Sequence, residues 1–374
     1  MMMKRVILKS YDAERFLPML QQMDGMEVVA LTDRKAEEKE MPDLGIEVLS
    51  TIKAKSLYQS GEIQEFLLPG TGKLSTIKSM EQELLSYGIK RDDIRVLWPE
   101  FLSDPTEENI CSVGNYSRIP YMEFHVADHC NLNCKGCVHF SPLVKGEVFA
   151  DYKMVEKDLR QLKSKVRQID VIRILGGEPL LNAELPKYIR LVRELYPDTR
   201  LGVVTNGLLL GKMSKEVILS MKETSCEIDV SLYPPVMEQM DRIAASLRAK
   251  GIQVNVSLPV NKFSYALDSR SGHAAFANRQ YCSCPNLYQG KLYVCPIIAY
   301  AYYFNDYFEG NLNTEDGAID LYDDSLSFAD LEDRLHRVYA LCDRCLYISR
   351  EHARERNWEQ TKIPKQEDYV WGLT

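Results

Sequence analysis

Strand-like and helix-like patterns alternate along most of this chain, and this alternation limits its possible folds more than any other feature. Short apolar runs predict strands, and segments with apolar residues at helical spacing lie between them. Strands that alternate with helices form parallel sheets, because a helix carries the chain back to the edge where it started. We therefore expect an α/β fold. The predicted strands are Arg5–Leu8, Glu27–Leu31, Ile46–Leu49, Glu65–Leu68 and Ile94–Trp98, followed by Tyr121–Ala127, Val171–Leu175, Leu201–Thr205, Glu227–Leu232 and Gln253–Leu258.

Residues 1–102 predict a Rossmann-like α/β domain. The turn after its first strand, residues 9–13, has no glycine, so the backbone cannot closely approach the pyrophosphate of a dinucleotide. Asp33 ends the second strand, where it is either a turn residue, which we favour, or an acid that binds a ribose. The stretch 67–76 looks like a P-loop, but Leu74 follows Lys73, so we interpret it as a turn.

The remaining boundaries follow changes in the pattern. Polar residues 103–118 predict a linker, and residues 119–263 predict a partial barrel of βα units with its chemistry at the carboxyl ends of the strands. Residues 264–350 predict a small cysteine-rich domain, and residues 351–374 a C-terminal tail.

The charge pattern argues against nucleic-acid and membrane partners. The net charge is −8, and residues 305–333 hold ten acidic residues and no Lys or Arg, so the rest of the chain is close to neutral and has no basic stripe. The longest apolar stretch, Val294–Phe304, is too short to span a bilayer, and the first residues do not form a signal peptide. We expect a cytoplasmic protein, whose ten cysteines are candidates for metal binding or catalysis rather than disulfides.

Three cysteines directly follow the first barrel strand. Cys130, Cys134 and Cys137 have the spacing CxxxCxxC on one loop, and soft thiolates grouped in this way bind zinc or an iron–sulfur cluster. A structural zinc needs a fourth ligand, for which only His129 and His139 are near. A [4Fe–4S] cluster held by three thiolates leaves one iron open for another ligand, and we favour this interpretation.

The motifs of residues 121–345 resemble those of the radical S-adenosylmethionine (radical SAM) superfamily. Beyond the cysteine loop, three further strand ends match this family in order. They are Gly176, Gly177, Glu178 and Pro179 after the second barrel strand, Thr205 and Asn206 after the third, and Ser231 after the fourth.

The resemblance implies a partial (βα)6 radical SAM barrel that binds a [4Fe–4S] cluster and S-adenosylmethionine (SAM). It implies that Cys130, Cys134 and Cys137 hold the cluster and that Glu178 receives the methionyl amino group of SAM. The family favours an aromatic residue before the third cysteine, where this chain has Gly136, so we expect Phe140 or His139 to cover the adenine. Reduction of such a cluster implies flavodoxin or ferredoxin as electron donor.

A second group of cysteines resembles the auxiliary-cluster twitch domain, a shortened SPASM domain. A predicted hairpin around Gly290 precedes Cys295, and a CxxC pair follows later. The resemblance implies a second [4Fe–4S] cluster on Cys295, on the pair, and on either Cys282 or Cys284. The thiol left over is inert, which we favour, or gives a hydrogen atom to a substrate radical as the catalytic group. A zinc knuckle is the structural alternative. The CxxC pair is Cys342 and Cys345.

The substrate does not follow from fold and cofactor. We expect an oxidoreductase, either dehydrogenase or epimerase, that abstracts hydrogen from a carbohydrate-like small molecule: a sugar, an aminocyclitol or a nucleotide sugar. This expectation rests on twitch-bearing relatives and on the Rossmann-like domain. The alternatives are a maturase of ribosomally made peptides and, as a different class, an iron–sulfur electron carrier without catalysis.

Overall fold

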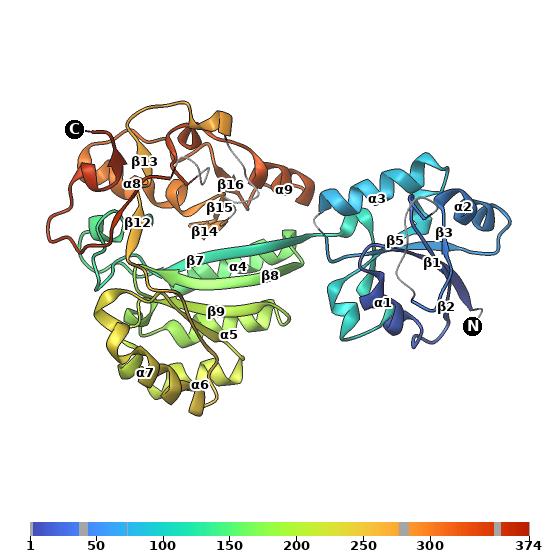
Figure 1. Cartoon of the computed structure of the whole chain (residues 1–374), viewed down its shortest axis with the longest axis horizontal. Helices are drawn as coiled ribbons and strands as arrows, with labels where there is room; N and C mark the ends of the chain where they lie inside the picture. Colours follow the sequence, from blue (N-terminus) through green and yellow to red (C-terminus); the bar gives the residue numbers. More distant parts are fainter. Residues whose placement is uncertain (1–2, 37–43, 73, 277–283, 348–352, 374) are drawn as a thin grey trace. The chain divides into compact units, whose positions relative to one another are not determined.

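The computed structural model describes residues 3–36, 44–72, 74–276, 284–347 and 353–373 (Figure 1). The chain forms two compact units, Met1–Arg118 and Ile119–Thr374.

The first unit is built on a six-stranded sheet in the order β3-β2-β1-β4-β5-β6. The first five strands of this order pair in parallel, whereas β6 runs antiparallel to β5. This is the strand order of open, doubly wound α/β sheets. Strands β1 to β3 are added towards one edge of the sheet and β4 to β6 towards the other, so the strand order reverses between β1 and β4. The strands are β1 (Lys4–Lys9), β2 (Met26–Thr32), β3 (Val48–Leu49), β4 (Glu65–Pro69), β5 (Ile94–Leu97) and β6 (Ile110–Ser112).

Helices cover both faces of this sheet because side chains of a strand alternate between its faces. Val6 and Leu8 of β1 belong to the apolar cluster that includes Phe16 of α1 (Ala13–Leu20). Lys9 instead pairs with Glu83 of α3 (Leu74–Ser86), which also accepts a hydrogen bond from Thr51 of α2 (Thr51–Gln59). The α/β pattern predicted for this part of the chain is therefore present.

Residues 103–118 do not form the expected linker. They contain β6, which extends the sheet of the first unit, and they contact the glycine-rich turn after β4. Tyr116 donates its hydroxyl hydrogen to the carbonyls of Gly70 and Gly72 (2.6 and 3.0 Å). A Cβ on Gly70 would lie 2.1 Å from the carbonyl oxygen of Leu97. The turn therefore needs glycine for close packing, while Lys73 lies outside the described residues.

The second unit contains an eight-stranded sheet in the order β11-β10-β9-β8-β7-β14-β15-β16. Helices connect β7 to β11 in sequence, as expected for βα units, and the pairs from β8 to β11 are parallel. The strands are β7 (Arg118–Ala127), β8 (Gln168–Gly176), β9 (Arg200–Thr205), β10 (Glu227–Val230) and β11 (Val254–Val256). The helices between them are α4 (Tyr152–Lys165), α5 (Leu185–Leu195), α6 (Lys215–Glu223) and α7 (Met237–Ala249).

The chain after β11 departs from the expected sixth βα unit. β12 (Lys262–Ser264) pairs with β17 (Glu355–Asn357), and β13 (Leu267–Asp268) pairs with β18 (Val370–Trp371). The residues expected as a tail thus supply two strands. In the described part of the chain, the strands of the predicted barrel are the five neighbours β7 to β11.

The cysteine-rich part continues the sheet on the β7 side. The predicted hairpin is present: β14 (Asn286–Tyr288) and β15 (Lys291–Tyr293) are antiparallel, with Gly290 (φ +77°) in the turn. The amide of Gly290 donates to buried Asp158 of α4 at 2.7 Å, which fixes the hairpin on the barrel. Helices α8 (Pro296–Phe308) and α9 (Phe328–His336) flank β16 (Ala318–Asp320) in sequence. The assignment as a twitch domain stays a prediction.

No helix in the described part of the chain has both the length and the apolar character needed to cross a membrane.

Substitution of Gly70 tests the packing of the turn after β4. We expect Gly70→Ala to lower the free energy of unfolding by about 1–3 kcal/mol, because the new Cβ forces the backbone away from β5. Gly114→Ala is the matched control, since a Cβ there meets no atom within 4 Å. Urea unfolding followed by circular dichroism measures both. Equal stability of the two variants would contradict this packing argument.

Candidate active site

A cavity of about 120 Å³ lies where β8, β9 and β10 end at their carboxyl edge. Parallel strands present their C-terminal loops at one edge, so residues far apart in sequence meet there. Nine residues singled out from the sequence line this cavity. They are Cys130, Cys134, Cys137, His139, Gly176, Gly177, Thr205, Asn206 and Ser231.

The three cysteine side chains of the loop after β7 share this cavity and are largely buried from water. Burial raises the pKa of the Cys130 thiol to about 11, and it also raises the pKa values of Cys134 and Cys137. The neighbouring thiols add to this shift, which shows that the three lie close together. Such thiols lose their protons when a metal centre binds, because its positive charge replaces the missing solvation.

Backbone and side-chain N–H groups point at these sulfurs. The amide of Leu132 donates to Cys130 Sγ at 3.4 Å, and Asn206 Nδ2 donates to the same sulfur at 3.5 Å. Trp358 Nε1 donates to Cys134 Sγ at 3.1 Å. Donors of this kind stabilise thiolates and tune the reduction potential of an iron–sulfur cluster. The donor set therefore fits a [4Fe–4S] cluster, although no three His, Cys, Asp or Glu side chains of the described residues surround a single metal-ion position.

The segment after β17 holds the cysteine loop in place. The amide of Lys135 donates to Glu359 O at 2.8 Å, the amide of Thr361 donates to Asn133 O at 2.9 Å, and Gln360 Nε2 donates to Leu132 O at 2.8 Å. No local sequence signal predicts these contacts, since the segment is more than 200 residues from the loop. The pairing of β17 with β12 and the bridge between Gln360 and Cys134 place Trp358 beside Cys134.

Gly176 and Gly177 let the end of β8 approach the end of β7. A Cβ on Gly176 would lie 2.0 Å from Ala127 O, and one on Gly177 would lie 2.2 Å from His129 O. Both positions therefore exclude every other residue. The glycine pair brings the backbone of β8 to the wall of the cavity.

Glu178 faces the protein interior and is fully buried. Its carboxylate accepts hydrogen bonds from Thr205 Oγ1 (2.8 Å), from the amide of Asn206 (2.9 Å) and from the amide of Leu180 (3.1 Å). Burial raises its pKa to about 7 against the opposing effect of these donors. Pro179 is buried beside it in a short 3-10 helix. In this arrangement Glu178 ties β8 to β9, and its direct contact with SAM stays a prediction.

The ends of β9 and β10 complete the wall. Asn206 Nδ2 also donates to Asn131 Oδ1 at 2.8 Å, which links β9 to the cysteine loop. The amide of Ser231 donates to Thr205 O at 3.0 Å, so its side chain is placed at the cavity. Tyr233 lines the same cavity and was not singled out from the sequence, although it stands two residues after Ser231.

That Phe140 covers the adenine stays a prediction, and Phe140 does not line the cavity. Phe140 is fully buried in the left-handed conformation (φ +55°) and packs against Tyr369 (5.5 Å between ring centroids). His139, the alternative residue, lines the cavity. Burial and the nearby His125 lower the pKa of His139 to about 3, so this imidazole is neutral. His139 Nδ1 lies 2.8 Å from His125 Nε2, and His125 Nδ1 lies 2.7 Å from Asp128 Oδ1.

The second group of cysteines meets around a separate apolar cavity of about 110 Å³. Cys284, Cys295 and Cys345 line it, together with Val138 and Tyr347. Cys342 is buried three residues before Cys345, and its sulfur accepts the amide hydrogen of Tyr339 at 3.4 Å. Cys282 lies outside the described residues. Among the described residues, Cys284 lines this second cavity and does not line the strand-end cavity.

A family comparison agrees with this geometry. Residues 125–258 match the model of the radical SAM superfamily. The fold and the cysteine-bearing strand-end cavity agree with this match to a radical SAM domain over residues 125–258.

Curated relatives of this domain are named GTP 3′,8-cyclase. That of Clostridium acetobutylicum is 34% identical over 101 residues, which is 26% of this chain and 31% of the relative. That of Sulfurovum sp. (strain NBC37-1) is 27% identical over 156 residues, 40% of this chain and 47% of the relative. The chain therefore spans less than half the length of these relatives.

Solved structures with similarity include BtrN in complex with AdoMet and 2-DOIA. It is 17% identical, with a TM-score of 0.35, and the match covers 62% of this chain and 92% of that chain. SuiB of Streptococcus suis bound to S-adenosylmethionine is 15% identical, with a TM-score of 0.32, covering 55% of this chain and 43% of that chain.

The expectation of carbohydrate oxidation or epimerisation is wrong on this evidence. The curated relatives carry the name of a GTP cyclase, not of a sugar dehydrogenase or epimerase. The expectation relied on the auxiliary cysteines and on the first α/β unit, and a fold does not by itself name a substrate. The catalytic role considered for Cys282 or Cys284 stays a prediction.

Removal of the Trp358 N–H tests the link between the C-terminal segment and the cysteine loop. We expect Trp358→Phe to make the reduction potential of the reconstituted cluster more negative by tens of millivolts. The reason is that the lost hydrogen bond stabilises the reduced, more negatively charged cluster, and tens of millivolts is on the order of the free energy of one hydrogen bond. Redox titration monitored by electron paramagnetic resonance measures the shift. Trp371→Phe is the control, because Trp371 packs on Tyr265 away from the cavity. An unchanged reduction potential in Trp358→Phe would contradict a hydrogen bond from Trp358 to a cluster-bound Cys134 sulfur.

Proposed function

We propose that this protein is a radical SAM enzyme that uses a [4Fe–4S] cluster on Cys130, Cys134 and Cys137. The observation that carries the proposal is the shared cavity, where the three thiols meet the ends of β8, β9 and β10. Zinc would need a fourth ligand from the loop or its surroundings. His129 instead accepts the amide hydrogen of Val148 at Nδ1, and His139 is bonded to His125, so both histidines have other partners.

When bound and reduced, the cluster supplies the electron that cleaves SAM into methionine and a 5′-deoxyadenosyl radical, which then takes a hydrogen atom from the substrate. The residues of the chain bind and orient the reacting groups and shield them from water. Gly176 and Gly177 offer backbone groups at the cavity wall, and Asn206 and Ser231 offer side-chain hydrogen bonds. Leu175 and Val204 give the cavity an apolar side that excludes water from the reacting groups.

We infer a nucleotide as the substrate class. This inference rests on the relatives named GTP 3′,8-cyclase, whose similarity to this chain reaches 34% identity. The neutral imidazole of His139 and the hydroxyl of Tyr233 offer hydrogen bonds to a base or a ribose at the cavity. The reductant is a low-potential carrier such as flavodoxin or ferredoxin.

We also propose an auxiliary [4Fe–4S] cluster in the second cavity. Three thiols already face this apolar space, and Cys342 stands next to it as a candidate fourth ligand. Burial in apolar surroundings protects such a cluster from solvent and shifts its potential. Cys282 is the alternative to Cys284 as a ligand.

Production of 5′-deoxyadenosine tests the reaction class. The anaerobically reconstituted protein with dithionite and SAM should form this product, and GTP should raise its rate more than sugars or short peptides do. Cys134→Ala should reduce formation to the level without protein, because the cluster loses a ligand. Cys226→Ala should retain the activity, because this buried thiol at the start of β10 does not line the cavity. No product above the Cys134→Ala level would refute the proposal.

Iron content tests the auxiliary cluster. We expect about eight irons per chain in the reconstituted protein, and about four in the variants Cys295→Ala and Cys345→Ala. Cys226→Ala again serves as the matched control and should keep all of the iron. About four irons in the unaltered protein would remove the second cluster, while leaving the first in place.

A further inference from the structure

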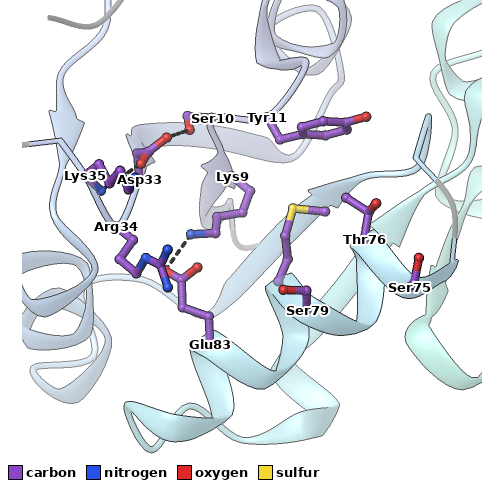
Figure 2. Close-up of a pocket in the computed structure, with 11 residues that line it drawn as sticks. Lys9, Ser10, Tyr11, Asp33, Arg34, Lys35, Ser75, Thr76, Ser79 and Glu83 are labelled. Carbon is purple, nitrogen blue, oxygen red and sulfur yellow. Dashed lines mark hydrogen bonds and ion pairs between the residues drawn. The ribbon is translucent and has the colours of Figure 1, made fainter. Parts of the chain in front are cut away.

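The first unit has a cavity of its own, lined by residues of that unit. It measures about 660 Å³, well within the range of small-molecule sites. It lies at the carboxyl ends of β1 and β2 and along α3, all within residues 9–83 (Figure 2). In open α/β sheets ligands bind in the crevice at this edge, at the point where the strand order reverses, which here falls between β1 and β4.

One wall of the cavity carries a fixed carboxylate. Asp33 directly follows β2, and its Oδ2 accepts a hydrogen bond from Ser10 Oγ at 2.5 Å, while its Oδ1 accepts the amide hydrogen of Lys35 at 2.8 Å. Figure 2 shows this pair side by side at the edge of the pocket. An acid held at the end of β2 in this topology is suited to bind the hydroxyl groups of a ribose.

Cations stand next to this carboxylate. Arg34 and Lys35 both line the cavity, and within the described residues neither forms an ion pair with an acidic side chain. Lys9, in contrast, is neutralised: its Nζ lies 2.7 Å from Glu83 Oε1 at the base of the pocket. These two cations next to Asp33 are suited to a phosphate group, which arginine binds with two parallel hydrogen bonds.

The opposite end of the cavity is suited to a flat ring. Tyr11, which is 45% exposed, and Thr76 lie at the other end of the pocket from Asp33 and Arg34 (Figure 2). Met80 adds an apolar surface, and Ser75 and Ser79 add hydroxyl groups from the first turns of α3. An exposed tyrosine with an apolar neighbour is a usual surface for stacking a base, and the hydroxyls can bind the edge of the ring.

From these features we propose that the first unit binds a mononucleotide, with its ribose on Asp33, its phosphates on Arg34 and Lys35, and its base near Tyr11. A bare phosphate fits less well, because the cavity is much larger than this ion. A dinucleotide is excluded by the loop after β1. There Asp12 stands at the start of α1, with its carboxylate bonded to Thr71 Oγ1 (2.5 Å) and Arg15 (3.2 Å), so a pyrophosphate cannot approach that helix.

This site goes beyond the proposed radical SAM reaction and is tested separately from it. Isothermal titration of the full chain with ADP, GDP, UDP and CDP should show binding of at least one of the four. The double variant Arg34→Ala/Lys35→Ala should weaken that binding by about tenfold or more, because the phosphates lose charged hydrogen bonds. Asp33→Ala should weaken it as well. The matched control removes two lysines of the same unit that do not line the cavity, Lys55→Ala/Lys90→Ala, and should bind as the unaltered chain does.

Three results would overturn the proposal. The first is no binding of any of the four nucleotides at roughly 1 mM. The second is binding that Arg34→Ala/Lys35→Ala leaves unchanged, which would place the nucleotide elsewhere, for example in the radical SAM domain. The third is inorganic phosphate binding as tightly as the nucleotides, which would show an anion site only. Formation of 5′-deoxyadenosine from SAM, measured on the same double variant, reports on the radical SAM reaction independently.

Discussion

The carboxyl ends of β7 and β8 approach so closely that only glycine fits between them, and the candidate active site depends on this contact. The amide of Gly177 donates to Ala127 O at 2.7 Å, and the amide of Glu178 donates to His129 O at 3.1 Å. A side chain at either glycine would collide with these carbonyl groups. The cysteine loop begins immediately after them, at Cys130. The contact therefore sets both the wall of the cavity and the position from which the three thiols are presented.

Glu178 extends this contact to the next strand at a cost in folding free energy. Its raised pKa of about 7 means that the folded protein binds the proton more tightly than the unfolded chain does. The cost is therefore present above pH 7 and disappears as the pH falls towards the ordinary glutamate value of 4.5. Hydrogen bonds from Thr205 and Asn206 offset part of it. In return, the buried carboxylate fixes Asn206, whose amide reaches Cys130 Sγ. Through Asn206, the fixed ends of β8 and β9 also help to position the Cys130 sulfur.

Much of this arrangement could be predicted from the sequence, because strand ends are encoded locally. An apolar run followed by glycine, asparagine or serine shows roughly where a parallel strand stops: β9 ends at Thr205 as predicted, and β10 ends at Val230, two residues before its predicted end. Contacts between distant segments could not be predicted. Trp358 reaches Cys134 only because β17 pairs with β12 more than 90 residues earlier in the chain. Phe140 turns into the core because Tyr369 of the last segment packs on it. The expected linker failed for the same reason, since β6 is recognisable only beside β5.

The two units show how one kind of scaffold offers different chemistry through its loops. In both, the candidate site lies at the carboxyl edge of parallel strands, where the strands are fixed by pairing and the loops are free to vary. After β1, the loop carries an acid at the start of α1, which repels anions there and leaves Arg34 and Lys35 as the cations of the pocket. After β7, the loop carries three thiols whose burial makes them poor acids until a metal centre binds. The reaction therefore follows from the loop residues and not from the sheet, which is why the α/β fold of the first unit was a poor guide to the substrate of the second.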